Sequence, residues 1–443
     1  MSPPHGDRHS GVRAKASPWT RSPHRSRDPG DNGRFMATAA DRPTPAATAP
    51  APDAASPTAF DTPTIVAVSG AHMVHDTYPA MVGVLLPLLI PQLGISLTVA
   101  GLLAATFRVA TAVQPVLGHI ADRADTRYWI ILAPGATAIA ISMLGLAPSP
   151  VMVALLLALA GVSSAVFHPA AAALVTRSSG TEWGRGTSIF MTGGESGRAV
   201  GPLAIAFVLS IVGLGASWIA LVPGVLFTAV LFMRLARRTE VHLRRPAGSI
   251  REGLRAARRP FVLLAASNAL MSMATVGLLV FIPTYLTDAG AGLVLAGAAV
   301  TVFEVGGAVG AFSGGTVSDR IGRRPMLAVA SGVGAPLLIL ALALPVGIAV
   351  LPLLALAGVV LLSAGPVQLV LMQELLPDNR STAVGLSIFV TTLTSAVGTV
   401  LVGALGQAMG LQTALMLAAG AALLALPFIA LLPETRHVSR EAA

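Results

Sequence analysis

The chain has 443 residues, of which 54% are hydrophobic and only 11% are charged, and its mean hydropathy is +0.76. This is more apolar surface than a soluble domain can bury, so we expect a membrane protein. The chain contains no cysteine, which excludes disulfides, thiolate metal sites, iron–sulfur clusters and cysteine nucleophiles.

The order of polar and apolar segments predicts twelve membrane-spanning helices. Residues 1–60 are rich in Pro, Ala, Ser, Asp and Arg without hydrophobic periodicity, which predicts a disordered tail. A first half (61–236), a linker (237–259), a second half (260–435) and a short tail (436–443) follow. The halves contain apolar runs of about 20 residues, the length that a spanning helix needs. We predict spans at 64–90, 97–121, 128–147, 150–176, 186–212, 215–236, 260–287, 291–315, 326–344, 347–373, 382–408 and 411–433.

Arginine marks one side of the membrane. The connections that follow odd-numbered spans contain no Lys or Arg, whereas nine arginines crowd the segment 234–259 on the opposite side. The positive-inside rule therefore predicts cytoplasmic termini in a bacterial inner membrane. The net charge of +9 does not indicate a nucleic-acid partner, because the basic residues lie in flanking segments without a folded basic face.

The two halves repeat a short motif. Gly118-His-Ile-Ala-Asp122-Arg123 follows the second span, and Gly315-Thr-Val-Ser-Asp319-Arg320-Ile-Gly322-Arg323-Arg324 follows the eighth. An even number of spans separates the copies, which predicts two parallel six-helix halves related about the membrane normal. Glycine allows helices to touch, and a carboxylate at a helix end can bind Arg and a facing helix N-terminus, so the motif favours a charge-dependent gate. A solvated turn that only supports topology is the alternative interpretation.

With these motifs the sequence resembles the major facilitator superfamily, and within it the fosmidomycin-resistance group of bacterial drug exporters. The resemblance covers residues 64–435 and rests on several short stretches: His72-Met-Val-His75-Asp76, Gln114-Pro115, Phe167-His168-Pro169, Gly193-Gly194, Gly201-Pro202 and Gln373-Glu374-Leu375-Leu376-Pro377. It implies a small-molecule exporter driven by proton exchange. Gly197, Gly201 and Pro202 resemble the antiporter motif of the superfamily.

Ionisable groups within spans are costly in lipid and mark a transport path or a partner. Asp76 in the first span is a candidate for proton binding, and helix pairing is the alternative. His75 is a candidate proton partner of Asp76. His72 and His75 are three residues apart on one face, but two ligands without further support do not predict a metal site. His168 precedes Pro169 and serves either a kinked helix or a proton relay.

Two further pairs of charges lie within predicted spans. Arg108 and Glu304 occupy nearly equivalent places in the two halves, and they either pair across a cavity or belong to separate ion pairs. Glu195 and Arg198 are three residues apart on the fifth span, where a local ion pair is expected.

We therefore predict a secondary active transporter, not an enzyme, that exports a small polar or anionic drug or metabolite in exchange for protons by alternating access. Proton-coupled uptake of a metabolite is the first alternative. An intramembrane enzyme or sensor is a distant one, since we find none of the usual catalytic motifs. The expected partners are the lipid bilayer, a small-molecule substrate and the proton. We expect a monomer with no cofactor and no metal.

Overall fold

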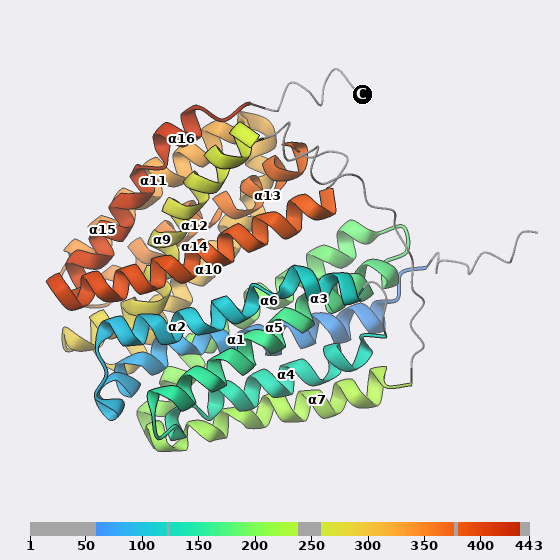
Figure 1. Cartoon of the computed structure of the whole chain (residues 1–443), viewed down its shortest axis with the longest axis horizontal. Coiled ribbons are helices and arrows are strands. Elements are labelled where there is room, and N and C mark those ends of the chain that lie inside the picture. Colours follow the sequence, from blue (N-terminus) through green and yellow to red (C-terminus); the bar gives the residue numbers. More distant parts are fainter. Residues whose placement is uncertain (1–58, 122–124, 238–257, 376–379, 435–443) are drawn as a thin grey trace, which may run out of the picture. The chain divides into compact units, whose positions relative to one another are not determined.

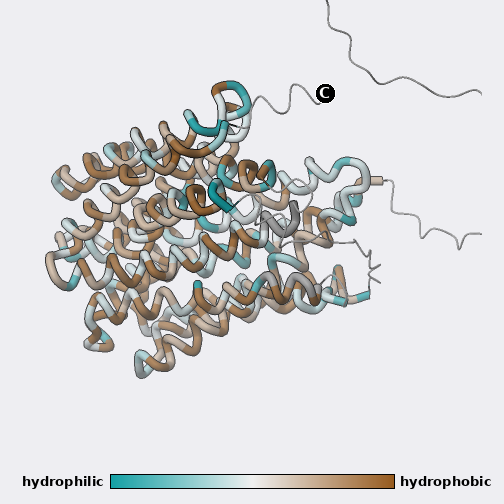
Figure 2. Tube along the Cα trace, turned by 45° about the horizontal axis from the view of Figure 1, so that its top comes forward, coloured by the Kyte–Doolittle hydropathy of each residue, from teal (hydrophilic) through white to brown (hydrophobic). Residues whose placement is uncertain are grey.

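The apolar runs form helices in the computed structural model, which describes residues 59–121, 125–237, 258–375 and 380–434. Nearly all of the predicted N-terminal tail and linker, the C-terminal tail, and the motif residues Asp122 and Arg123 lie outside these described residues. Within them, eleven helices are long and apolar enough to cross a membrane, and Leu97–Thr111 is a shorter apolar helix. Hydrophobic residues run along the helices (Figure 2).

The helices of the first half match the first six predicted spans. They are α1 (Thr62–Leu93), α2 (Leu97–Thr111), α3 (Gln114–Ala121), α4 (Arg127–Ser142), η1 (Leu144–Leu146), α5 (Pro150–Ser178), α6 (Trp183–Val212), η2 (Leu214–Ala220) and α7 (Leu221–Leu235). Capping residues define several starts: the Ser96 hydroxyl accepts from the N–H of Val99, and the Ser149 hydroxyl accepts from that of Met152.

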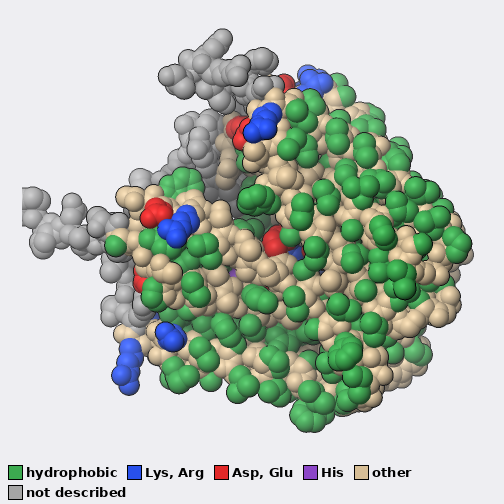
Figure 3. Space-filling view, turned by 180° about the vertical axis from the view of Figure 1, so that it is seen from behind, with side chains coloured by type: hydrophobic (Ala, Val, Ile, Leu, Met, Phe, Trp, Pro, Cys, Tyr) green, Lys and Arg blue, Asp and Glu red, His purple; other side chains and the backbone are tan. Residues whose placement is uncertain are grey.

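The second half repeats this order in the upper part of Figure 1. Its helices are α9 (Arg258–Asp288), α10 (Leu293–Ile321), α11 (Arg323–Ala343), α12 (Val350–Leu362), α13 (Ala364–Leu375), α14 (Arg380–Met409), α15 (Leu411–Leu423) and α16 (Leu426–Ala430). Hydrophobic side chains cover much of the face seen in Figure 3, and only 17% of an apolar 18-residue stretch of the span Leu214–Leu235 is buried. Such a helix is suited to contact with lipid.

The second predicted span, 97–121, is divided. Helix α2 ends at Thr111 and α3 begins at Gln114. Pro115 has no N–H to donate to residue 111, and its ring would crowd that carbonyl in a continuous helix. The proline thus explains why one apolar run forms two helices.

A glycine contact is repeated in the two halves. A Cβ atom on Gly161 of α5 would lie 2.3 Å from the carbonyl oxygen of Phe107 on α2. A Cβ atom on Gly358 of α12 would lie 2.1 Å from the carbonyl oxygen of Phe303 on α10. The glycines are 197 residues apart (358 minus 161), the offset of the duplicated Gly-x-x-x-Asp-Arg motif. The charged residues after these phenylalanines, Arg108 and Glu304, are 196 residues apart (304 minus 108), one fewer than this offset, and they therefore occupy nearly equivalent positions in the two halves.

The halves touch near the connections that lack Lys and Arg. There the N–H of Leu97 donates to Gln407 Oε1 over 2.9 Å. A Cβ atom on Gly101 of α2 would lie 2.8 Å from the Thr399 carbonyl oxygen on α14, and one on Gly83 of α1 would lie 2.4 Å from the Leu279 carbonyl oxygen on α9. The described residues between 59 and 434 accordingly form one compact unit.

The repeated glycine contact predicts a sensitive position. We expect Gly161→Ala to lower the free energy of unfolding by about 1–3 kcal/mol, because α2 and α5 must move apart. Gly420→Ala on α15 is the control, since a Cβ atom there has nothing within 4 Å and alanine favours a helix. Thermal unfolding of the purified protein in detergent measures both. Equal melting temperatures for the two variants would contradict the close packing.

Candidate functional site

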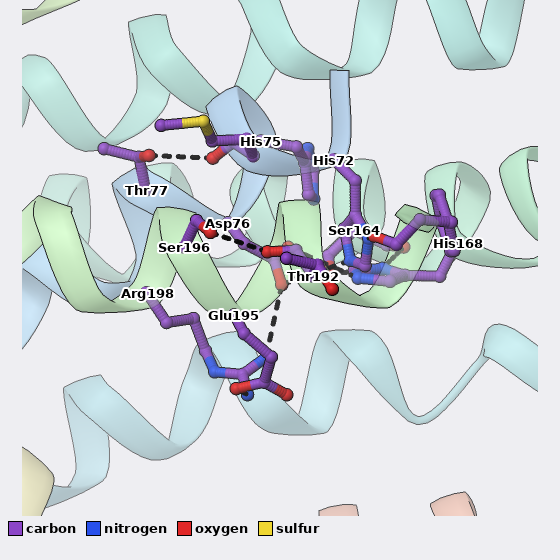
Figure 4. Close-up of polar contacts among 12 residues, drawn as sticks. His72, His75, Asp76, Thr77, Ser164, His168, Thr192, Glu195, Ser196 and Arg198 are labelled. Carbon is purple, nitrogen blue, oxygen red and sulfur yellow. Dashed lines mark hydrogen bonds and ion pairs between the residues drawn. The ribbon is translucent and has the colours of Figure 1, made fainter. Parts of the chain in front are cut away.

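Asp76 lies at the centre of a buried cluster of charged and polar side chains. Only 8% of its surface is exposed. Its Oδ2 atom lies 3.3 Å from Nε2 of His72 on the same helix, and its Oδ1 atom lies 3.3 Å from Nε2 of His168 on α5. Figure 4 shows these side chains pointing toward one another from α1 and α5. One carboxylate therefore faces two imidazoles.

The second nitrogen of each imidazole is held by a backbone carbonyl. His72 Nδ1 lies 2.8 Å from the Phe190 carbonyl oxygen, and its ring stacks on the Phe190 ring with centroids 4.1 Å apart. His168 Nδ1 lies 2.9 Å from the Ser164 carbonyl oxygen one turn earlier in α5. These contacts fix the orientation of both rings and direct both Nε2 atoms at Asp76.

Arg198 of α6 connects this cluster to the second half of the molecule. Its guanidinium lies 3.6 Å from Asp76 Oδ2 and forms an ion pair with Glu195, one turn earlier in α6. Its Nε atom also lies 3.4 Å from Oε2 of Glu304, a buried residue on α10. One side chain thus bridges three carboxylates and both halves.

A row of glycines brings α6 against α1. Cβ atoms on Gly197 and Gly201 would lie 2.1 Å and 2.2 Å from the carbonyl oxygens of Met73 and Thr77. A Cβ atom on Gly194 would lie 2.4 Å from Cε1 of the His72 ring. The glycines of the antiporter-like motif therefore place Arg198 beside Asp76.

These residues line a cavity between the halves with a volume of about 240 Å³. Asp76, Arg108, His168, Arg198 and Glu304 all face it, together with apolar residues of α1, α2, α9 and α10. In the space-filling view an acidic side chain is visible inside a recess (Figure 3). Arg108 shares the cavity with Glu304, but the ion pair of Glu304 is with Arg198. The guanidinium of Arg108 is a cation directed at the cavity.

The same cluster contains the donor atoms of a possible metal site. Ligand atoms of His72, Asp76 and His168 lie within 4.8 Å of one another. However, the Asp76 oxygens already have partners, because His72 and His168 each lie 3.3 Å from one of them and the Arg198 guanidinium lies 3.6 Å from Oδ2. We therefore interpret the cluster as an ion-pair network, and the absence of a metal stays a prediction.

The second copy of the repeated motif forms a polar cluster at the other end of α10. Arg323 contacts Asp319 Oδ1 at 2.6 Å and Glu374 Oε1 at 3.1 Å. Glu434 accepts the backbone N–H groups of Arg323 and Arg324 at 3.0 and 3.1 Å, at the N-terminus of α11. Gly322 precedes them with φ +106°, a conformation that favours glycine. The motif thus joins four segments of the second half.

Comparisons with known proteins identify the family of this chain. The family model described as Major Facilitator Superfamily matches residues 68–399 and 293–443. The chain belongs to the Major Facilitator Superfamily. It is 31% identical to the uncharacterized MFS-type transporter YfnC of Bacillus subtilis (strain 168), over 79% of this chain and 88% of that protein. It is 27% identical to the fosmidomycin resistance protein of Escherichia coli (strain K12), over 84% of this chain and 93% of that protein.

Solved structures of other transporters share the fold. A bacterial homologue of the human lysosomal transporter Spinster, in an inward-facing and unoccupied conformation, has a TM-score of 0.70 at 16% identity and covers 85% of this chain and 97% of its own. The nucleoside transporter NupG has a TM-score of 0.67 at 15% identity and covers 84% of this chain and 100% of its own. The prediction of a major facilitator fold, and of a transporter rather than an enzyme, is confirmed.

Within this superfamily fold, His75 has a different place from the one expected. Its ring stacks on Phe167, with centroids 4.5 Å apart, and its Nδ1 atom lies 3.3 Å from Thr137 Oγ1. The imidazole on α1 that contacts Asp76 is that of His72, which the sequence analysis did not select. The signal was available, because residues four apart lie on one helix face whereas adjacent residues do not.

The motif predicted to act as a gate also differs in detail from the expectation. A Cβ atom on Gly315 would have nothing within 4 Å, whereas one on the neighbouring Gly314 would lie 2.6 Å from the Ser363 carbonyl oxygen. Arg320 is exposed. Gly118 belongs to α3, but Asp122 and Arg123 lie outside the described residues. Glu374 and Glu434, absent from the predicted gate, provide the acceptors for Arg323 and the start of α11.

The contacts of Arg323 predict a structural role that Arg324 does not share. We expect Arg323→Ala to lower the melting temperature of the purified protein, because two carboxylates lose their guanidinium partner. Arg324→Ala retains the backbone N–H bonded to Glu434 and is the matched control. A melting temperature lowered equally by both substitutions would show that general charge, rather than these contacts, stabilises this end.

Proposed function

We propose that this protein is a proton-coupled secondary transporter that exports a small polar or anionic molecule by alternating access. The observation that carries the proposal is Asp76, set between two imidazoles and Arg198 at the wall of a cavity between the halves. Charged groups inside a membrane are retained where they serve transport or pair with one another, and this cluster does both.

Alternating access requires that the halves separate on one side while they touch on the other. The contacts through Leu97, Gly101 and Gly83 lie near the connections without Lys or Arg, which the positive-inside rule assigns to the outer face. This arrangement supports an inward-facing conformation with cytoplasmic termini. Opening outward would separate α1 from α9 and α2 from α14 while the opposite ends of the halves approach.

The cavity suits a small cargo with an anionic group. Its volume of about 240 Å³ admits a small molecule, and Arg108 offers a guanidinium that is not held by an ion pair with Glu304. For exchange, cargo and proton must compete. Cargo and proton compete if a hydrogen-bond donor of the cargo binds the Asp76 carboxylate. Protonation of the cluster engages the same carboxylate and so weakens its contact with the cargo. The likeness to the fosmidomycin resistance protein and the glycine row of α6 support export.

Uptake by symport is the second candidate, and the balance of charge favours it for a purely anionic cargo. Asp76, Glu195 and Glu304 face Arg108 and Arg198, so one negative charge is in excess until protons bind. Added protons would then promote anion binding rather than oppose it. The pH dependence of affinity separates the candidates: lower pH weakens cargo binding in an exchanger and strengthens it in a symporter.

Proton coupling at Asp76 predicts a clear result in everted membrane vesicles. With fosmidomycin as the probe, an imposed gradient with acid inside should drive accumulation, and Asp76→Asn should abolish it. Asp288→Asn, at the exposed end of α9, is the matched control and should retain accumulation. Full accumulation by Asp76→Asn, or accumulation unaffected by a protonophore, would refute this role.

Recognition of an anionic group by Arg108 predicts a change in affinity. We expect Arg108→Gln to raise the half-saturating fosmidomycin concentration roughly 10- to 100-fold, the loss expected for a charged hydrogen bond of about 1.5–3 kcal/mol. Arg185→Gln is the control, because Arg185 forms an exposed ion pair with Glu182 outside the cavity. Concentration-dependent uptake in the same vesicles measures both variants. An unchanged half-saturating concentration for Arg108→Gln would remove Arg108 from the binding site.

A further inference from the structure

We propose that His72 and His168 are the proton-accepting groups of this transporter, one proton on each, and that Asp76 stays ionised as their shared acceptor. The inference rests on the proposed proton coupling and assigns its carriers and its stoichiometry. It differs from simple titration of the carboxylate, for which one proton would suffice.

The first step concerns which ring nitrogen changes its proton. A carbonyl oxygen can only accept a hydrogen bond, so Nδ1 of His72 carries a hydrogen toward Phe190. We assign the same tautomer to His168, whose Nδ1 lies 2.9 Å from the Ser164 carbonyl oxygen and 3.2 Å from the Ser164 hydroxyl, which can also accept a hydrogen bond. The hydrogen on Nδ1 is therefore present whether the ring is neutral or charged. Only Nε2 remains to gain or lose a proton, and in both rings it faces Asp76.

The second step concerns what those Nε2 atoms meet. Each lies 3.3 Å from a different oxygen of the Asp76 carboxylate. A neutral ring with its hydrogen on Nδ1 would direct a lone pair at a carboxylate oxygen, and two electron-rich atoms repel each other. A proton on Nε2 changes this into a charge-assisted hydrogen bond. The geometry therefore fits two imidazolium rings on one carboxylate.

The third step concerns the neighbouring charges, because these determine whether two protons can bind. The groups that face the pair from the surrounding helices are His75 and Asp76 of α1, Arg108 of α2, Glu195 and Arg198 of α6, and Glu304 of α10. Their three carboxylates exceed their two guanidiniums by one negative charge. Two protons on the histidines would change that excess to one positive charge, so the net charge of these groups stays within one unit of zero in both states.

The release of protons has a physical route through Arg198. Arg198 lies 3.6 Å from the same Oδ2 atom that His72 approaches. When His72 loses its proton, the guanidinium can take over that oxygen, and when the proton returns, Arg198 remains held by Glu195 and Glu304. His72 and Arg198 thus compete for Oδ2 of Asp76. Through this competition, the charge on His72 affects the ion pair of Arg198 with Glu304, which joins the halves.

The protonation assignment can be tested without any cargo. Full-length protein labelled with [15N]histidine, in lipid nanodiscs, is titrated by NMR from about pH 9 to about pH 5, a range that spans ordinary histidine titration. His72→Gln and His168→Gln assign the signals. We expect Nε2 of both residues to gain a proton while Nδ1 stays protonated. A titrating Asp76 carboxyl group, observed with [13C]aspartate, or two histidines that stay neutral would overturn the assignment.

The stoichiometry is tested in proteoliposomes with the membrane potential clamped at zero and fosmidomycin as the probe. Two exchanged protons predict accumulation of about 100-fold per pH unit, and one proton predicts about tenfold. We expect His72→Gln and His168→Gln each to lower the accumulation from about 100-fold to about tenfold per pH unit. His75→Gln, which replaces the other histidine on α1, should leave the accumulation at about 100-fold. Unchanged ratios in both single variants would overturn the inference while proton coupling stands. Cargo exchange without any response to pH in the unmodified protein would overturn the coupling itself.

Discussion

A charge in the interior of a membrane protein must find a partner, because lipid and apolar side chains cannot replace its hydration. Arg198 meets this requirement with carboxylates from three helices. Since Glu304 belongs to the second half, the same guanidinium also contributes to the contact between the halves. The cavity lies beside this bridge, since Arg198 and Glu304 both line it. Charged side chains need polar surroundings, so the helices around this ion pair do not close against each other through apolar packing alone.

The charged cluster in turn requires close contact between backbones. Arg198 reaches Asp76 because α6 lies directly on α1, and this approach is possible because Gly197 and Gly201 present no side chain. Gly194 has a different role, because the absence of a Cβ atom there leaves the space that the His72 ring occupies. The small residues of this motif therefore determine how closely Arg198 can approach the Asp76 carboxylate.

Sequence periodicity was sufficient for the number and order of the spans, because length and hydropathy are local properties. It was not sufficient for the divided second span, where Pro115 outweighs the apolar pattern. The charged pair Glu195 and Arg198 could be predicted from their spacing along one helix. The contact of Asp76 with His168 on α5, and that of Glu434 with the N-terminus of α11, depend on how distant segments pack, which a single sequence does not specify.

The two halves share a backbone plan but differ in their polar contents, and this difference explains where a proton can act. In the first half the helices α1, α5 and α6 contribute an aspartate, two histidines and an arginine. In the second half α9, α13 and α14 contribute Asn268, Gln368 and Thr391, which form a neutral hydrogen-bonded group with distances of 2.8 and 3.1 Å. Amides and hydroxyls do not titrate near neutral pH.

A change of pH near neutrality therefore alters electrostatic energy around Asp76, while the hydrogen bonds among Asn268, Gln368 and Thr391 within the spans of the second half keep their strength. The Glu304 side chain is the exception, because it extends from the second half to Arg198 and feels every change of charge around Asp76. A titration confined to one half can only move the halves relative to each other through a contact that crosses between them. The Arg198–Glu304 ion pair is such a contact. Its strength depends on how closely the Arg198 guanidinium is also held by Asp76.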